Sequence, residues 1–227
     1  MEHRSIGTAQ NAVSADTQKV LRNTYMLLGM TLAFSALTAG ISMSMNLGGG
    51  AAMIMSLAAL AIVWLVLPRT ANTAMGLPVV FLFTGLLGAA LGPMLNRYLA
   101  LPSGSEMVMQ ALGGTAIIFF SLSAYVLTSK KDFSFMGGFL FAGMMVVIVG
   151  MVGGMIASFF FGVDVSIFRL ALSGAIVLLM SGFILFDTSR IINGGETNYI
   201  MATVSLYLNI YNLFTALLHI IGATSDD

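Results

Sequence analysis

The chain has no cysteine and very few charged residues. The absence of cysteine excludes disulfide bonds, thiolate metal sites and cysteine nucleophiles. Lysine, arginine, aspartate and glutamate make up only 8% of its 227 residues, whereas soluble domains carry about 25%. Hydrophobic residues make up 58%. A chain this apolar cannot cover itself with polar surface, which indicates an integral membrane protein and argues against a soluble enzyme.

Several other functional signals are also missing. The formal net charge is zero, and basic residues occur singly or in pairs without interleaved aromatics, so no nucleic-acid partner is expected. The sequence contains no GxxxxGK[ST], HExxH or GxSxG pattern and no visible pairing of a nucleophile with a base. We therefore predict a protein that is not an enzyme and binds no cofactor.

The chain is rich in long apolar segments, and crossing a membrane takes about 20 such residues. The segments are continuously apolar instead of alternating, which predicts an all-α protein and argues against a β-barrel. We expect a polar, unstructured cytoplasmic tail at 1–23, a transmembrane domain at 24–222 and a short C-terminal tail at 223–227. The seven predicted helices are Tyr25–Met45, Gly50–Leu67, Leu77–Leu95, Met107–Thr128, Phe135–Phe161, Val165–Phe186 and Tyr199–Ile221.

The distribution of lysine and arginine predicts the orientation in the membrane, because cytoplasmic loops carry an excess of both. An N-terminus inside the cell leaves only Arg97 and Arg169 outside, and an odd number of helices then places the C-terminus outside. The basic residues on the inner side would be Arg4, Lys19, Arg22, Arg69, Lys130, Lys131 and Arg190.

Asp187 is the first candidate functional residue. It stands near the cytoplasmic end of the sixth predicted helix, where a carboxylate is costly unless it is paired or hydrated. One interpretation is an ion or proton site, with Asp187 as a contact for Ca²⁺. The other is a helix-end residue that pairs with Arg190 or with Arg69.

The seventh predicted helix carries a narrow polar face, which we expect to point into the helix bundle. Asn209 on this face lies about 15 Å along the axis from Tyr199, near the membrane midplane. The face either lines a pathway or forms hydrogen bonds between helices, and a structural role is expected for His219. Its members are Asn198, Ser205, Asn209, Asn212, Ala216 and His219.

Two sets of glycines predict close packing between helices, because small residues let helix backbones approach each other in membranes. The alternative is that they mark flexible points. They are Gly85, Gly88 and Gly92 in the third predicted helix and Gly150, Gly153 and Gly154 in the fifth.

Four longer motifs resemble the bacterial YccA-like branch of the Bax inhibitor-1 family. The resemblance runs from about Lys19 to the C-terminus. It implies six helices around a central seventh, and a location in the bacterial inner membrane. The motifs are Val20–Tyr25, Leu112–Ala116, Ser123–Thr128 and the stretch Gly194–Ile200 with Ala202–Leu208.

The resemblance implies two functions. Members of this branch bind and modulate the membrane protease FtsH and associate with its partners HflK and HflC, with the N-terminal tail as the handle for degradation. Other bacterial members are pH-sensitive calcium leaks, in which two aspartates on helices six and seven share a proton and an arginine near the end of helix two contacts one of them.

By position, Asp187 in Phe186-Asp187-Thr188 matches the first of these aspartates, and Arg69 loosely matches the arginine. Asn209 stands where the second aspartate belongs. An amide cannot titrate or supply a second charge, so the sequence favours the FtsH modulator. One alternative is a calcium or cation leak with Asp187 as its titrating site, and another is a proton-coupled transporter. Besides FtsH, the expected partners are membrane lipid and Ca²⁺ or H⁺.

Overall fold

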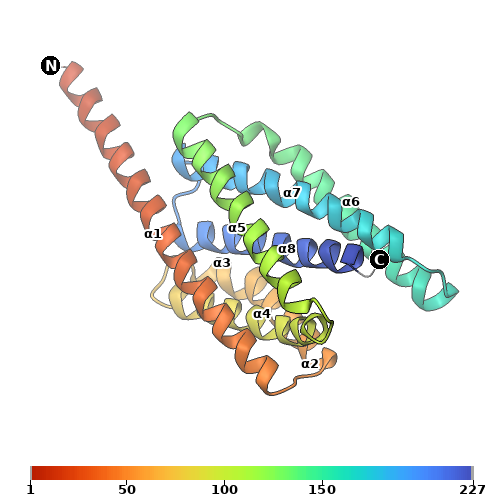
Figure 1. Cartoon of the computed structure of the whole chain (residues 1–227). Coiled ribbons are helices and arrows are strands. Elements are labelled where there is room, and N and C mark those ends of the chain that lie inside the picture. Colours follow the sequence, from red (N-terminus) through yellow and green to blue (C-terminus); the bar gives the residue numbers. More distant parts are fainter. Residues whose placement is uncertain (1, 226–227) are drawn as a thin grey trace. The chain divides into compact units, whose positions relative to one another are not determined.

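The computed structural model describes the backbone of residues 2–225 and the side chains of residues 16–225. This part of the chain contains helices and no strand. The elements shown in Figure 1 are α1 (Glu2–Ser44), α2 (Gly49–Ala61), the π-helical turn η1 (Ile62–Val66), α3 (Leu67–Thr70), α4 (Gly76–Leu99), α5 (Gly104–Ser129), the 3₁₀ turn η2 (Ser134–Met136), α6 (Gly137–Phe161), α7 (Ser166–Ile192) and α8 (Tyr199–Ser225).

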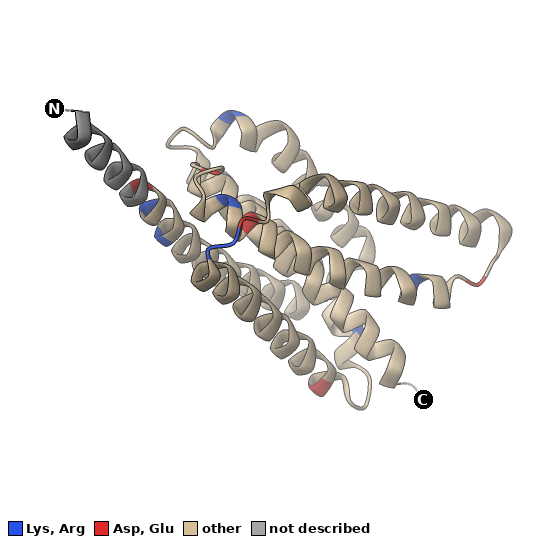
Figure 2. Cartoon of the chain, turned by 90° about the horizontal axis from the view of Figure 1, so that it is seen from above, with Lys and Arg blue, Asp and Glu red and all other residues tan. Residues whose placement is uncertain are grey.

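Seven spans in the described residues are long and apolar enough to cross a membrane. This confirms the predicted all-α membrane protein, and each predicted helix has its counterpart. In Figure 2 the charged residues gather near helix ends, and the long middle stretches of the helices are largely free of them. The spans are Asp16–Ser44, Gly49–Thr70, Gly76–Leu99, Gly104–Ser129, Ser134–Phe161, Ser166–Ile192 and Tyr199–Ser225.

The predicted unstructured tail needs a correction where it meets the first span. Residues 16–23 are helical and continue into the apolar part of α1. They include Gln18, Lys19, Leu21 and Arg22, which are good helix formers, so the helix extends beyond its apolar stretch. The backbone of residues 2–15 belongs to the same helix, so the prediction of an unstructured tail was wrong there as well; the side chains of residues 1–15 lie outside the described part of the chain.

The chain divides into two compact units. The first unit comprises residues 1–101 and 191–207, and the second comprises residues 102–190 and 208–227. Helix α8 therefore contributes its first part to one unit and its remainder to the other.

In the first unit, α4 packs against α1 through the first predicted set of glycines. A Cβ atom on Gly85 would lie 2.7 Å from the Phe34 ring, and one on Gly92 would collide with Ser42. A Cβ atom on Gly88 would collide with the backbone carbonyl of Ser35. The close-packing prediction is confirmed for these three glycines.

We expect Gly88→Ala to destabilise the first unit by about 1–3 kcal/mol, because a backbone carbonyl leaves no room for the added methyl group. Thermal unfolding in detergent measures this loss. The control is Gly29→Ala in α1, where nothing lies within 4 Å of a Cβ atom. Equal melting temperatures for the two variants would contradict the tight packing of α4 on α1.

In the second unit, α6 and α7 interlock through glycines and leucines. A Cβ atom on Gly143 of α6 would lie 2.6 Å from Leu179 of α7, and one on Gly182 of α7 would lie 2.6 Å from Leu140 of α6. This mutual fit fixes α7 against α6 and so positions the residues that α7 carries.

The second predicted set of glycines lies farther along the same contact. A Cβ atom on Gly150 would lie 3.1 Å from the Leu172 side chain, and one on Gly154 would lie 3.2 Å from the Phe168 side chain. The prediction was wrong for Gly153, where nothing lies within 4 Å. Gly153 and Gly154 are neighbours in the chain, and adjacent residues on a helix point about 100° apart, so only one of them faces α7.

A π-helical turn separates α2 from α3, directly before Pro68. Proline has no backbone N–H, so it cannot donate to the carbonyl one turn earlier, and the helix is locally irregular there. The Arg69 guanidinium donates from Nη1 to the carbonyl of Leu65. Arg69 is thus held against its own helix by a local hydrogen bond.

Candidate functional site

Asp187 and Asn209 form a direct hydrogen bond inside the second unit. Asn209 Nδ2 donates to Asp187 Oδ2 at 2.7 Å, and the two side chains are only 6% and 8% exposed. Because α7 continues to Ile192, Asp187 lies within the helix and not at its end. The structure therefore brings together the two residues that the sequence singled out on separate helices.

The chemistry of this pair differs from that of two carboxylates. An amide N–H donates to a carboxylate oxygen, and such a bond stabilises a buried acid without a second titrating group. The pair carries at most one negative charge. In the described residues no group of three or more histidine, cysteine, aspartate or glutamate side chains is arranged to hold a metal ion.

The loop between α5 and α6 contacts Ser189 of α7, two residues after Asp187. The hydroxyl of Ser189, which is fully buried, accepts a hydrogen bond from the backbone N–H of Phe133 at 2.8 Å. The same hydroxyl lies 3.4 Å from the Lys131 carbonyl and 3.4 Å from Asp132 Oδ1. The α5–α6 connection is thus tied to the turn of α7 that carries Asp187.

Hydrogen bonds also fix the charges of this loop. The side chain and the backbone N–H of Ser134 both form hydrogen bonds with the Asp132 carboxylate, and the bond from the backbone is 2.8 Å long. These bonds hold the pKa of Asp132 below its ordinary value. A hydrogen bond with the Tyr125 hydroxyl, 3.0 Å long, raises the pKa of Lys131. Both groups therefore keep their charges at neutral pH.

The two arginines proposed as partners of Asp187 make other contacts. The Arg190 guanidinium lies 5.6 Å from the centre of the Phe186 ring, in a cation–π arrangement. Arg69 contacts Leu65 and belongs to the first unit, whereas Asp187 belongs to the second. Pairing of either arginine with Asp187 stays a prediction.

Every residue of the predicted polar face of α8 is buried or half-buried. Asn198 caps α8 by accepting hydrogen bonds from the backbone of Ile200 and Met201, and it donates to the Ala71 carbonyl at 3.1 Å. His219 Nδ1 lies 2.9 Å from the Ser173 hydroxyl of α7. The two ends of the face thus make structural contacts between segments.

The two remaining candidates on α8 are Ser205 and Asn212. Both are half-buried, Ser205 in the first unit and Asn212 in the second. The backbone carbonyl of Asn212 accepts a hydrogen bond from the Thr215 hydroxyl at 3.0 Å. A role for their side chains in an ion pathway stays a prediction.

A buried polar cluster in the first unit was not predicted from the sequence. The Tyr207 hydroxyl lies 2.6 Å from the Ser35 hydroxyl and donates to the Thr84 carbonyl at 3.3 Å. Tyr207 is 1% exposed and packs edge-on against Phe83. Its position inside a membrane span was the available signal, because a buried phenol needs a hydrogen-bond partner there.

The model of a protein family described as "Inhibitor of apoptosis-promoting Bax1" matches residues 17–226. The chain belongs to the Bax inhibitor-1 family. The match covers all seven membrane spans except the first residue of the first one. The family assignment confirms the resemblance found in the sequence.

Several relatives in this family resemble the chain over nearly its whole length. A protein of Vibrio cholerae named as an uncharacterized membrane protein is 52% identical over 93% of this chain and 92% of its own. The Escherichia coli protein named "Modulator of FtsH protease YccA" is 50% identical over 93% of both chains. An uncharacterized Pseudomonas aeruginosa protein is 45% identical over 95% of this chain and 94% of its own.

Proposed function

We propose that this Bax inhibitor-1 family protein binds FtsH in the bacterial inner membrane and modulates its activity in membrane-protein quality control. The E. coli relative that supports this proposal is named as a modulator of that protease and is 50% identical over 93% of both chains. In this proposal the protein is a binding partner and not an enzyme, and HflK and HflC join the same assembly.

The Asp187–Asn209 hydrogen bond is the structural observation that favours the modulator over a calcium leak. A pH-gated leak of the two-aspartate type needs two acids that share a proton. Here the second position offers an amide donor at 2.7 Å, which stabilises the carboxylate without adding charge. The pair is suited to joining α7 to α8 within the second unit.

Co-purification tests the proposal. The full chain, carrying an affinity tag and solubilised in mild detergent, should enrich FtsH together with HflK and HflC. The control is an unrelated seven-span protein with the same tag at the same abundance. Equal recovery of FtsH with both proteins would contradict the binding proposal.

The proposed orientation places the N-terminus in the cytoplasm and the C-terminus outside. It follows from the lysine and arginine distribution, since seven basic residues lie on one predicted side and two on the other. A reporter that is active only outside the cytoplasm should work when fused after Asp227 and should be silent when fused after Lys131. The reverse pattern would overturn this orientation.

One observation favours the leak as a second candidate function. Asp187 is an acid buried inside a membrane span, and such residues commonly belong to ion or proton pathways. In this alternative Asp187 is the titrating group and a Ca²⁺ contact. The Asn209 variants described in the Discussion separate it from the modulator.

A further inference from the structure

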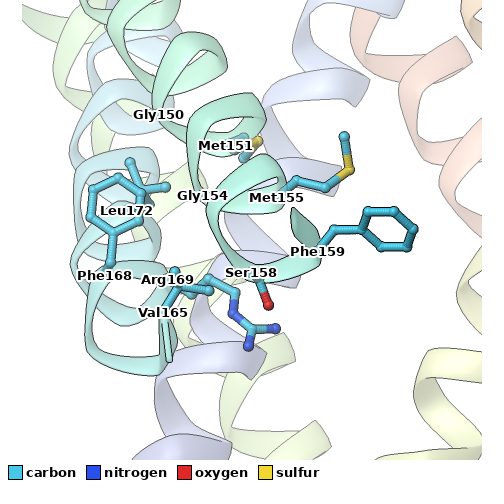
Figure 3. Close-up of a pocket in the computed structure, with 10 residues that line it drawn as sticks. All are labelled: Gly150, Met151, Gly154, Met155, Ser158, Phe159, Val165, Phe168, Arg169 and Leu172. Carbon is cyan, nitrogen blue, oxygen red and sulfur yellow. The ribbon is translucent and has the colours of Figure 1, made fainter. Parts of the chain in front are cut away.

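A pocket opens between α6 and α7 in the second unit, away from the Asp187–Asn209 pair. Its volume is about 610 Å³, within the range of about 300–1,000 Å³ typical of ligand pockets. Figure 3 shows its lining, in which Met155 and Phe159 extend from α6 and Phe168 and Leu172 from α7. Met155 and Phe159 are 66% and 81% exposed, so the pocket is accessible from the membrane side of the helices.

The pocket has one polar end and one apolar end. Ser158 lies three residues before the end of α6, and Arg169 three residues after the start of α7. At 1.5 Å per residue both lie about 4.5 Å from their helix ends, at the depth of a lipid headgroup region. Leu172 and Gly150 lie deeper along the same helices, where acyl chains are found.

Two glycines of α6 form part of the pocket wall. Gly150 and Gly154 let Leu172 and Phe168 of α7 pack close to the α6 backbone, and all four residues line the pocket. The lining leads from the Arg169 guanidinium near the helix ends to apolar side chains deeper along the helices. An elongated apolar molecule with a phosphate at one end matches this arrangement.

The α6–α7 turn next to the pocket carries a negative charge. The carboxylate of Asp164, in the α6–α7 turn, accepts a hydrogen bond from the Ser166 backbone N–H at 2.9 Å. This bond and, to a smaller extent, the charge of Arg169 hold the pKa of Asp164 below its ordinary value. Asp164 therefore stays ionised at neutral pH, and it directly precedes Val165, which lines the pocket together with Arg169.

We propose that this pocket binds a zwitterionic aminophospholipid such as phosphatidylethanolamine. The headgroup phosphate binds the Arg169 guanidinium, which forms strong charge-assisted hydrogen bonds with phosphate. The headgroup ammonium faces Asp164, and one acyl chain lies along Met155, Phe168 and Leu172. The site gives the second unit a specific lipid contact that is independent of the FtsH proposal.

Native mass spectrometry of the purified full chain tests this site. The protein is mixed with equal amounts of phosphatidylethanolamine and phosphatidylglycerol, and the retained lipid is measured. We expect preferential retention of phosphatidylethanolamine. Arg169→Gln should lower lipid retention about tenfold, the size expected for one lost charge-assisted contact.

Arg97→Gln is the matched control, because Arg97 lies in the last turn of α4 at the same predicted side of the membrane. It should leave lipid retention unchanged. Asp164→Asn should keep binding but remove the preference for phosphatidylethanolamine over phosphatidylglycerol. Melting temperatures near that of the original protein show that each variant is folded.

Three results would overturn the proposal. The first is equal lipid retention by the Arg169→Gln and Arg97→Gln variants. The second is displacement of the lipid by inorganic phosphate alone, which would show an anion site without a lipid chain. The third is a dimer that forms in place of the lipid-bound species, which would assign the pocket to a second copy of the chain.

Discussion

Replacing Asn209 with aspartate is expected to give the protein a pH-dependent calcium flux, whereas no such flux is expected of the original chain. The new carboxylate would stand within hydrogen-bonding distance of Asp187, since Asn209 Nδ2 already lies 2.7 Å from Asp187 Oδ2. Two acids this close titrate as a coupled pair, holding one proton between them and releasing it as the pH rises. The variant then acquires a second charge in a site that is otherwise limited to one.

A trapped calcium dye in liposomes measures this flux between about pH 6 and 8, where such a coupled pair is expected to titrate. We expect at least a severalfold change across this range for Asn209→Asp and a flat, low flux for the original chain. The additional intramembrane acid should cost about 2–3 kcal/mol of stability. Thermal unfolding in detergent checks that cost and shows whether the variant is folded.

The exchanged pair is the sharpest control for this experiment. The double variant Asp187→Asn/Asn209→Asp keeps one acid and one amide and reverses only their positions, so it should show no pH-dependent flux. Strong pH-dependent flux in the original chain that disappears in Asp187→Asn would show instead that one acid is enough. The calcium leak would then be the leading function.

Deleting residues 2–15 is expected to lengthen the half-life of the protein severalfold in cells that contain FtsH. A AAA protease engages a terminal segment of its substrate, and this polar stretch precedes the first apolar span. The deletion keeps Lys19 and Arg22, which mark the cytoplasmic side. It also keeps residues 16–23, which belong to the helix that enters the membrane. Turnover after a block of protein synthesis measures the half-life, with an FtsH-deficient strain for comparison.

A glycine–serine segment of the same length provides the matched control for the tail. If the protease needs only a flexible handle, the substituted chain should be degraded like the original. If it reads the tail's own residues, the substituted chain should be as stable as the deletion variant. An unchanged half-life after deletion would show that the tail is not the handle.

The membrane spans could be predicted from the sequence because their signal is local. A run of about 20 apolar residues is sufficient evidence for a transmembrane helix, whatever it later packs against. The small-residue pattern of α4 was also readable, because Gly85, Gly88 and Gly92 share one helix face. The helix ends were predicted less accurately, since the sixth predicted helix ended at Phe186 whereas α7 continues through Asp187 to Ile192.

The candidate site could be predicted only in its members and not in its contacts. Asp187 and Asn209 each stood out as a polar residue in an apolar span, but their mutual hydrogen bond depends on how α7 packs against α8. The tie between Ser189 and Phe133 joins residues 56 positions apart, and no local pattern encodes it. The Tyr207–Ser35 contact joins residues 172 positions apart and was missed for the same reason.

The most direct test of the central claim is the rate at which FtsH degrades a membrane substrate in proteoliposomes, with and without this protein. We expect the full chain to change the degradation rate in proportion to its amount, without any pH-dependent calcium flux in the same vesicles. An unchanged degradation rate at saturating amounts of the protein, together with a calcium flux that responds to pH, would contradict the proposed modulation of FtsH.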